Sequence, residues 1–421
     1  EGPATTLHGA ALPGLPNLHS HTFQRGMAGL AEKRGPGSDS FWTWREVMYR
    51  FLGALTPDDV EAIAAMAMVE MLEGGFTSLA EFHYLHHAAD GASYADPAEL
   101  AGRIVAAAHE TGLGLTLLPV FYAQGGFGGQ PAQPGQRRFV SQDADAYLRL
   151  REAARIHTAR HGMSLGAAPH SLRAVTPDQL KAFVHSIKDG PIHIHVAEQT
   201  REVDDCVAWS GQRPVRWLLD NAPVDQRWCL IHATHMDEGE VADMARTGAV
   251  AGLSRAVVGV CPITEANLGD GLFAGPAFRD AGGFYGVGSD SNVEIDAPGE
   301  LRLFEYGQRL FHRGRNIMAD REGASTGETL YRHALKGGKR ALGHNVGAIA
   351  IGQRADFVIL DTTHPGMTEQ PENWLDSYIF VAGRTAIQTV IAGGSVCVSD
   401  GQHQKRDAIA ARFRKTMARL V

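Results

Sequence analysis

The sequence predicts an α/β fold: a (β/α)8 TIM-type barrel with a small β-sandwich-like domain formed mainly by the C-terminal segment. Its 421 residues suit a barrel of about 250 residues that carries insertions and a smaller appendage. Short apolar runs alternate with helical stretches along most of the chain, and most runs are continuously apolar, as strands buried on both faces require. After residue 344 the alternation gives way to strand-like runs joined by Gly-rich turns.

Each apolar run is expected to form a barrel strand, in chain order. The runs are LPNLHSH (15–21), TSLAEFH (77–83), GLTLLPVF (114–121), SLGAAPH (164–170), PIHIHVAE (191–198), WCLIHAT (228–234), an unusual double segment at 249–262 and FYGVGSD (284–290). Helices are expected between them, for example over 57–73, 97–111, 144–161 and 177–188. Several of these begin with Thr-Pro or Asp-Pro, an N-cap followed by proline in the first helical turn.

The same change in pattern predicts the domain boundaries. Residues 1–14 are interpreted as the remnant of an N-terminal β segment, 15–344 as the barrel, and 345–421 as the small β-domain with a final helix over 406–420. We expect that helix to be amphipathic and solvated. Because the chain starts with Glu1 and enters a strand-like run almost at once, we expect its natural N-terminus to be missing.

Composition argues against several classes of protein. The net charge is -8 and no Lys/Arg-rich run occurs, so we expect neither a nucleic-acid partner nor a membrane partner. No run is long enough to span a bilayer and no secretory signal is seen. The four cysteines form no CxxC pair, which predicts reduced core thiols in a cytoplasmic protein.

Polar side chains gather at the C-terminal ends of the expected strands, the face on which barrels build active sites. His19 and His21 end the first strand and point to the same side, His195 lies on the fifth, and Asp290 ends the eighth. Taken singly, each is more often a core residue or a helix cap. Together they suit one divalent metal ion with an open position for water. Zinc is our first choice, although iron and manganese accept the same ligands.

Two further residues beside these ends have proton-carrying side chains. Glu198 lies just beyond the fifth strand and His232 ends the sixth. A carboxylate near the metal serves as a proton carrier, and Asp290 can take a proton from the water while it holds the metal. His232 can stabilise the oxygen of a tetrahedral centre by hydrogen bonding. We therefore interpret Glu198, His232 and Asp290 as catalytic.

Long phrases in the sequence resemble one known family. They are PNLHSHTFQRGMAG, FWTWREVMYR, EFHYLHH, PHSLRAVTP, HIHVAEQ, HATH and TEANLGDG, and they resemble the formimidoylglutamate deiminase family of the amidohydrolase superfamily over nearly the whole chain. The resemblance implies a homodimer in histidine degradation and a single metal ion held by His19, His21, His195 and Asp290. Dinuclear members carry a carboxylated lysine on the fourth strand, whereas here that strand ends in Ala-Pro-His170.

The resemblance also implies a small dicarboxylic substrate. The expected reaction is hydrolysis of N-formimidoyl-L-glutamate to N-formyl-L-glutamate and ammonia by a metal-activated hydroxide. We expect Arg45 and Arg173 in loops after barrel strands, where arginine pairs bidentately with carboxylates. By resemblance the substrate pocket holds Gln24, Arg45, Tyr84, His170 and Arg173.

Two other functions stay open at this point. One is an aminohydrolase that acts on a purine, pyrimidine or triazine ring, which would need a pocket lined by aromatic and amide groups. The other is a non-catalytic metal-binding barrel, which would need no proton carrier such as Glu198. The aromatic residues Phe41, Trp42 and Trp44 are expected to be loop packing, and His83 receives no role. The segment 249–262 is longer than the family pattern, as if AVAGL and AVVGV were near-repeats.

Overall fold

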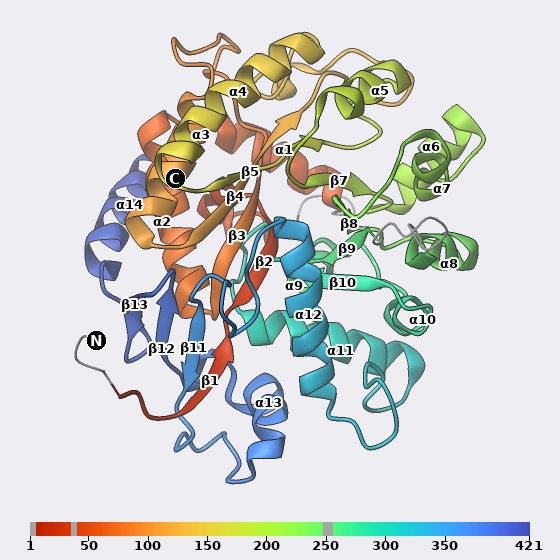
Figure 1. Ribbon diagram of the computed structural model, residues 1–421. Helices are drawn as coiled ribbons and strands as arrows, with labels where there is room; N and C mark the ends of the chain where they lie inside the picture. The colour runs from red at the N-terminus through yellow and green to blue at the C-terminus, as the bar shows by residue number, and fades with distance from the viewer. Residues whose placement is uncertain (1–5, 35–39, 247–255) are drawn as a thin grey trace.

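The computed structural model of the chain describes residues 6–34, 40–246 and 256–421 (Figure 1). Its centre is made of two parallel sheets with strand orders β2-β3-β4-β5 and β10-β9-β8-β7, and β6 pairs with β4. Isolated parallel bridges join the two sheets at both seams, Ser20 to Asp290 at one and Ala167 to Ile192 at the other. The strands are β2 (Leu15–Ser20), β3 (Phe76–His83), β4 (Gly114–Phe121), β5 (Ser164–Leu165), β6 (Ala168–Pro169), β7 (Ile192–Val196), β8 (Trp228–His232), β9 (Val257–Val260) and β10 (Phe284–Val287).

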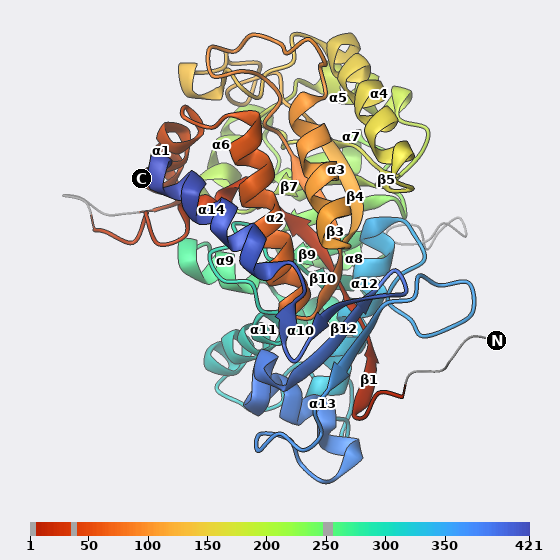
Figure 2. The same cartoon turned by 90° about the vertical axis from the view of Figure 1, so that its left-hand side faces the viewer.

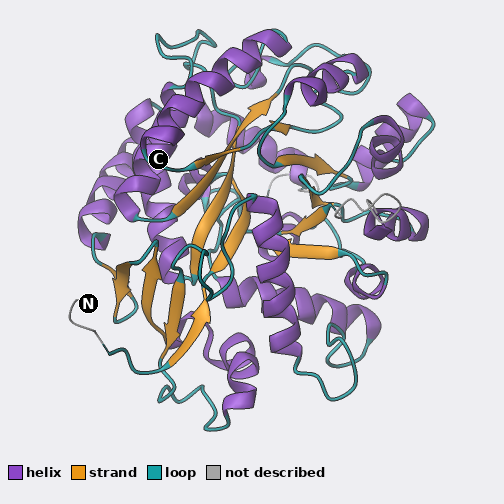
Figure 3. Cartoon of the chain, in the orientation of Figure 1, coloured by secondary structure: helices purple, strands orange, loops and turns teal. Residues whose placement is uncertain are grey.

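Helices surround these strands (Figure 3), and the predicted helices are confirmed to within a few residues. They are α1 (Phe41–Leu52), α2 (Pro57–Glu73), α3 (Glu99–Thr111), α4 (Ala144–Arg160), α5 (Pro177–Ser186), α6 (Thr200–Ser210), α7 (Pro214–Asn221), α8 (Glu238–Arg246), α9 (Pro262–Leu268), α10 (Gly275–Asp280), α11 (Ala297–His312), α12 (Thr326–Leu342), α13 (Trp374–Ser377) and α14 (Arg406–Leu420). The Thr-Pro signal is confirmed at α2, where the Thr56 side chain accepts from Asp59 N and the Asp59 side chain accepts from Thr56 N. This reciprocal cap satisfies two backbone donors at the start of the helix.

Two predicted strands differ in detail from the structure. The run 164–170 is divided into β5 and β6 at Gly166, where a Cβ atom would overlap Leu118 and the carbonyl oxygen of Pro191. Of the double segment 249–262, residues 249–255 lie outside the described part of the chain, and the rest forms β9 and the start of α9. The pairing of β9 with both β8 and β10 keeps the predicted strand order at this point.

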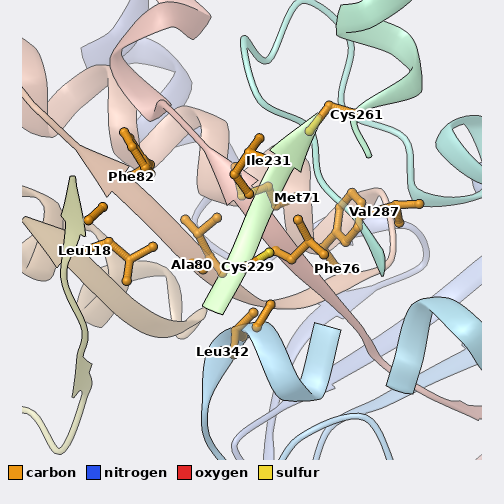
Figure 4. Packing of buried hydrophobic residues seen from close by; sticks show 14 of the residues in the cluster. Met71, Phe76, Ala80, Phe82, Leu118, Cys229, Ile231, Cys261, Val287 and Leu342 are labelled. Carbon is orange, nitrogen blue, oxygen red and sulfur yellow. The ribbon is translucent and has the colours of Figure 1, made fainter. Parts of the chain in front are cut away.

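The core lies between the parallel strands and the helices around them (Figure 4). Every residue of β3, β4, β7 and β8 is buried, as the continuous apolar runs predicted. Phe76, Ala80, Ile231 and Val287 belong to one contiguous apolar cluster. All four cysteines are free and buried, which confirms the prediction of core thiols. No described helix is both long and apolar enough to cross a bilayer.

A five-stranded antiparallel sheet lies beside the parallel sheets, with strand order β1-β11-β12-β13-β14. Its strands are β1 (Ala10–Pro13), β11 (Phe357–Leu360), β12 (Ile387–Ala392), β13 (Ser395–Ser399) and β14 (Gln402–His403). The short N-terminal segment therefore contributes a strand, which pairs with β11. The sandwich-like arrangement and the domain boundaries stay predictions.

The last helix is packed and not simply solvated. Helix α14 runs along α2 (Figure 2), and it buries Ile409. Arg419 forms an ion pair with Asp59 of α2, and Arg406 forms one with Glu73 at the end of α2. The prediction of a helix over 406–420 is confirmed. One face of this helix packs against α2, so the helix is not surrounded by solvent as we expected.

Candidate metal centre and active site

Three imidazoles and one carboxylate meet at the C-terminal ends of the parallel strands. His19 and His21 lie at the end of β2, His195 on β7, and Asp290 in the turn after β10. One ligand atom of each lies within 4.8 Å of the others. The Nε2 atoms of His19 and His195 are 3.1 Å apart, and Asp290 Oδ1 lies 3.4 Å from His19 Nε2 and 3.3 Å from His21 Nε2. The structure thus brings the four predicted ligands together.

Backbone and amide hydrogen bonds hold β2 beside the turn that carries Asp290. His21 N donates to Asp290 O at 2.9 Å, and Asp290 N donates to His19 O at 3.0 Å. The buried Asn292 amide donates to the carbonyl oxygens of His21 and Asp290 at 3.1 and 2.9 Å. We did not predict a role for Asn292, which lies two residues after the predicted strand FYGVGSD.

The donor set fits a divalent cation. Nδ1 of His21 lies 2.9 Å from Phe82 O, and Nδ1 of His195 lies 3.2 Å from His170 O. Because a carbonyl oxygen only accepts, both Nδ1 atoms carry the proton and both Nε2 atoms present a lone pair to the cluster. Buried lone pairs that face one another are stabilised by a cation between them. Three imidazoles and one carboxylate are the kind of ligands that zinc prefers.

Burial keeps the imidazoles neutral, which is the form that binds a metal. It lowers the pKa of His19 to about 3, despite the opposing hydrogen bond with Asp290, and it also lowers the pKa of His21 and of His195. Burial alone would disfavour the Asp290 carboxylate. Its hydrogen bond with His19 and the nearby imidazoles nevertheless hold the pKa of Asp290 below its usual range.

Glu198 and His232 flank this cluster. Nε2 of His232, at the end of β8, lies 3.8 Å from Glu198 Oε1 and 3.7 Å from Asp290 Oδ2. Burial raises the pKa of Glu198 to about 7, against the effect of His232 and Arg173. Burial disfavours the imidazolium form, but Glu198 and a hydrogen bond with Glu265 raise the pKa of His232 to about 10. The two side chains can therefore exchange protons with a bound molecule.

Two buried acids that we did not predict hold the loop after β7. Glu202 accepts from the backbone N–H groups of Ala197 and Glu198, at 3.3 and 3.1 Å. The side-chain amide of Gln199 donates to Asp270, which is the aspartate of the phrase TEANLGDG. Glu198 is thus carried by a loop that is fixed on both sides.

The backbone at two site residues is strained. His232 has a φ of 67° and Asp290 a φ of 44°, in the left-handed region that non-glycine residues rarely adopt. Such strain concentrates at functional sites and persists only where the surroundings enforce it. Glu265, the glutamate of TEANLGDG, provides part of that enforcement, because its Oε1 lies 3.1 Å from His232 Nδ1.

A pocket opens beside the cluster and contains every predicted substrate residue. Its lining includes Gln24, Arg45, Tyr84, His170 and Arg173, together with His21, His195, Glu198, His232 and Asp290. Gln24 Nε2 donates to the Tyr84 hydroxyl at 2.8 Å. The Nε atoms of Arg45 and Arg173 are buried without a hydrogen-bond partner, and within the described ranges neither guanidinium is paired with a carboxylate. The pocket therefore contains two guanidinium groups that can bind anionic groups of a ligand.

Arg45 lies on a helix, so the prediction that it sits in a loop is wrong. It belongs to α1, which begins after Ser40, whose side chain accepts from Trp42 N. Phe41 and Trp44 of the same helix line the pocket, and the Arg45 guanidinium lies 4.6 Å from the centre of the Trp42 ring. The aromatic cluster is therefore a helix face at the pocket and not loop packing.

His83 is not part of the pocket lining. It ends β3 and is buried beside His86, with 5.5 Å between the ring centres. Burial lowers the pKa of His83 to about 3, so this ring is neutral. Within the described residues, neither ring nitrogen of His83 has a hydrogen-bond partner, so no hydrogen bond joins this ring to the cluster.

Comparison with known proteins agrees with this geometry. The sequence model of the amidohydrolase family matches residues 10–397. The chain is 51% identical over 420 residues to formimidoylglutamate deiminase from Pseudomonas aeruginosa. The alignment covers 99% of this chain and 91% of that protein. It is also similar to the crystal structure of an amidohydrolase from Brucella melitensis, with a TM-score of 0.92, 49% identity, and coverage of 99% and 93% of the two chains.

A more distant structure shares the fold alone. It is an adenosine deaminase from Xanthomonas campestris with bound zinc, with a TM-score of 0.77, 22% identity, and coverage of 98% of this chain and 86% of that chain.

Proposed function

The chain belongs to the amidohydrolase family, and we propose that it is a metal-dependent deiminase that hydrolyses N-formimidoyl-L-glutamate to N-formyl-L-glutamate and ammonia. Half of its residues are identical to those of a formimidoylglutamate deiminase along nearly the whole chain. The observation that carries the substrate assignment is the pair of half-buried arginines beside the His/Asp cluster, Arg45 and Arg173, which form no ion pair with a carboxylate of the described residues. A place in histidine degradation follows from this substrate.

The proposal includes an eight-stranded barrel and a resident ion. The parallel bridges at both seams support a barrel in which β5 and β6 share one strand position. His19, His21, His195 and Asp290 would hold one divalent cation, with zinc as the first choice. When bound, such a cation lowers the pKa of water to about 7 and so supplies hydroxide near neutral pH.

The protein's own groups then move protons. Glu198 accepts one proton from the attacking water and Asp290 accepts the other, and each residue passes its proton on to the terminal nitrogen of the formimidoyl group. His232 donates from Nε2 to the oxygen as charge develops on it. A C–O bond forms, the bond from the formimidoyl carbon to the terminal nitrogen breaks, and that nitrogen leaves as ammonia. The two hydrogens that it gains are those of the water.

The arginines orient the substrate. Carboxylates pair bidentately with guanidinium groups, so one carboxylate at Arg45 and one at Arg173 would give each of these half-buried arginines an ion-pair partner. Gln24, Tyr84 and His170 line the space between these arginines and the cluster and would contact the substrate backbone. Because each guanidinium group binds an anionic group more strongly than a neutral one, we expect the pocket to select dianionic molecules.

One substitution tests this clamp. Loss of the Arg173 guanidinium removes charge-assisted hydrogen bonds worth about 1.5–3 kcal/mol, so Arg173→Ala should raise KM by roughly 10- to 150-fold. Arg50→Ala, which removes an exposed arginine of α1, is the matched control and should leave KM unchanged. Ammonia release from N-formimidoyl-L-glutamate is the assay. An unchanged KM in Arg173→Ala would contradict the clamp.

The second candidate is an aminohydrolase for a purine, pyrimidine or triazine ring. The aromatic side chains of Phe41, Trp44, Tyr122 and Phe139 in the pocket lining favour it. A neutral ring would leave both arginines unpaired, which is why we place it second. Ammonia release from adenosine or guanine, measured against the formimidoyl compound, separates the two. We also propose a homodimer, which sedimentation velocity would test.

A further inference from the structure

We propose that Glu265 is a positioning residue that fixes the ring of His232 and presents its Nε2 atom to the reaction. This inference rests on the proposed function for the role of His232. It assigns a purpose to the glutamate of TEANLGDG, a phrase for which the reaction described above provides none.

The contact is direct and enclosed. Nδ1 of His232 lies 3.1 Å from Glu265 Oε1, and the backbone N–H of Cys261 donates to the same oxygen at 2.9 Å. His232 is 1% exposed and Glu265 5% exposed, so water does not compete freely for either group. Cys261 comes directly before α9, which carries Glu265. The backbone at the start of α9 therefore fixes the position of the Glu265 carboxylate, and this carboxylate in turn fixes the imidazole of His232.

This contact decides which nitrogen of His232 faces the site. A carboxylate accepts, so the proton of the Glu265 contact is on Nδ1 of the imidazole. Nε2 then points to the other side, 3.8 Å from Glu198 Oε1 and 3.7 Å from Asp290 Oδ2. Within the described residues, that Nε2 atom is buried without a hydrogen-bond partner. It is therefore free for a group of the substrate.

Glu265 does not reach the substrate itself. The pocket lining includes its neighbour Thr264 but not Glu265, so the carboxylate acts only through the ring. The need for such a restraint is visible in the backbone, because the left-handed φ of 67° at His232 gives the side chain an orientation that local structure alone would not select.

Two variants separate positioning from general stability. Glu265→Leu removes the acceptor, whereas Glu265→Gln keeps an oxygen that can accept from both Nδ1 and Cys261 N. Loss of an outer-shell partner costs about 10- to 100-fold in activity. We expect the kcat of Glu265→Leu to fall by this factor, with KM within about 3-fold of wild type and unchanged bound metal. We expect Glu265→Gln to keep most of the wild-type kcat. Glu300→Gln is the matched control, because Glu300 is buried and accepts from Ile263 N of α9 without touching His232.

A spectroscopic measurement tests the contact without substrate. In protein made with isotope-labelled histidine, the Nδ1–H proton of His232 should give a downfield NMR signal that Glu265→Leu loses and that Glu265→Gln and Glu300→Gln keep. A Leu variant that loses this signal but keeps the wild-type kcat would overturn the proposal. So would a wild type without the signal. If the Leu variant does not fold, the Gln variant decides: loss of the signal with an unchanged kcat overturns it. Failure of wild type to release ammonia would instead refute the proposed function.

Discussion

Replacing Glu198 by glutamine should remove the proton carrier and leave the site otherwise intact. The substitution keeps the shape of the side chain, and the hydrogen bond that fixes this position comes from the Glu198 backbone N–H to Glu202. The residues proposed as metal ligands are His19, His21, His195 and Asp290, and Glu198 is not one of them. We therefore expect Glu198→Gln to bind its metal and its substrate like wild type.

The magnitude follows from the setting of the carboxylate. Glu198 is 4% exposed, and burial raises its pKa to about 7, which populates both the protonated and the ionised form near neutral pH. A positioned acid or base contributes roughly 100- to 10,000-fold to the rate, or about 3–5 kcal/mol in the barrier. The kcat of Glu198→Gln should fall by that factor, with KM within about 3-fold of wild type.

The assay is ammonia release from N-formimidoyl-L-glutamate, measured together with the metal content of the same preparation. Glu369→Gln, the same change at an exposed position, should leave both quantities unchanged. Turnover of Glu198→Gln within about 3-fold of wild type would refute the reasoning, because that is far less than a proton carrier contributes. A low kcat with lost metal would show instead that the variant damages the cluster.

Three further predictions concern metal, packing and pH. A chelator should lower the Tm, and added zinc should restore it, because an ion that binds only the folded state stabilises it; a Tm that ignores the chelator contradicts the metal site. Gly337→Ala on α12 should lower the free energy of unfolding, measured by urea denaturation, by about 1–3 kcal/mol or more, since its Cβ atom would overlap Tyr285 O. Gly239→Ala is the control and should change the urea midpoint little, because its Cβ atom would meet only the Asp237 side chain. The ion pairs of Asp189 with Arg155 and Arg151 lower its pKa to about 2. The contribution of these ion pairs to the free energy of unfolding is present above the unfolded pKa of 3.8 and is lost as the pH falls through about 2. Because Asp189 is half exposed, Asp189→Asn should cost at most about 1 kcal/mol at pH 7 and nothing near pH 2, and an equal cost at both pH values would contradict this.

The cluster of His19, His21, His195 and Asp290 could be predicted from the sequence because strand geometry is local and regular. His19 and His21 are two residues apart on one strand and therefore point to the same side. Parallel strands bring their carboxyl ends to one face, so residues as distant as His21 and Asp290 meet without any further information. The Thr-Pro start of α2 was accessible for the same reason, since a cap needs only neighbouring residues.

Other features depend on packing that no local pattern encodes. Glu265 contacts His232 only because α9 follows β9, the strand that pairs with β8, and a glutamate at that spacing has no sequence signature. The helix of Arg45 was missed because aromatic residues hid its N-terminal signal, although Ser40 stands at the capping position. The break between β5 and β6 falls at Gly166, where the close approach of Pro191, a residue of the next segment, leaves no room for a Cβ atom.

The pairing of β1 with β11 has a consequence for the order of folding. Residues 10–13 are made before all the parallel strands, yet their partner at 357–360 is made only after them. During synthesis the first strand therefore waits with its backbone donors and acceptors exposed to water, while more than three hundred residues emerge. Closing so long a loop is entropically costly, and contacts this distant form late. The small sheet should consequently be the last unit to form and the first to open under mild denaturant.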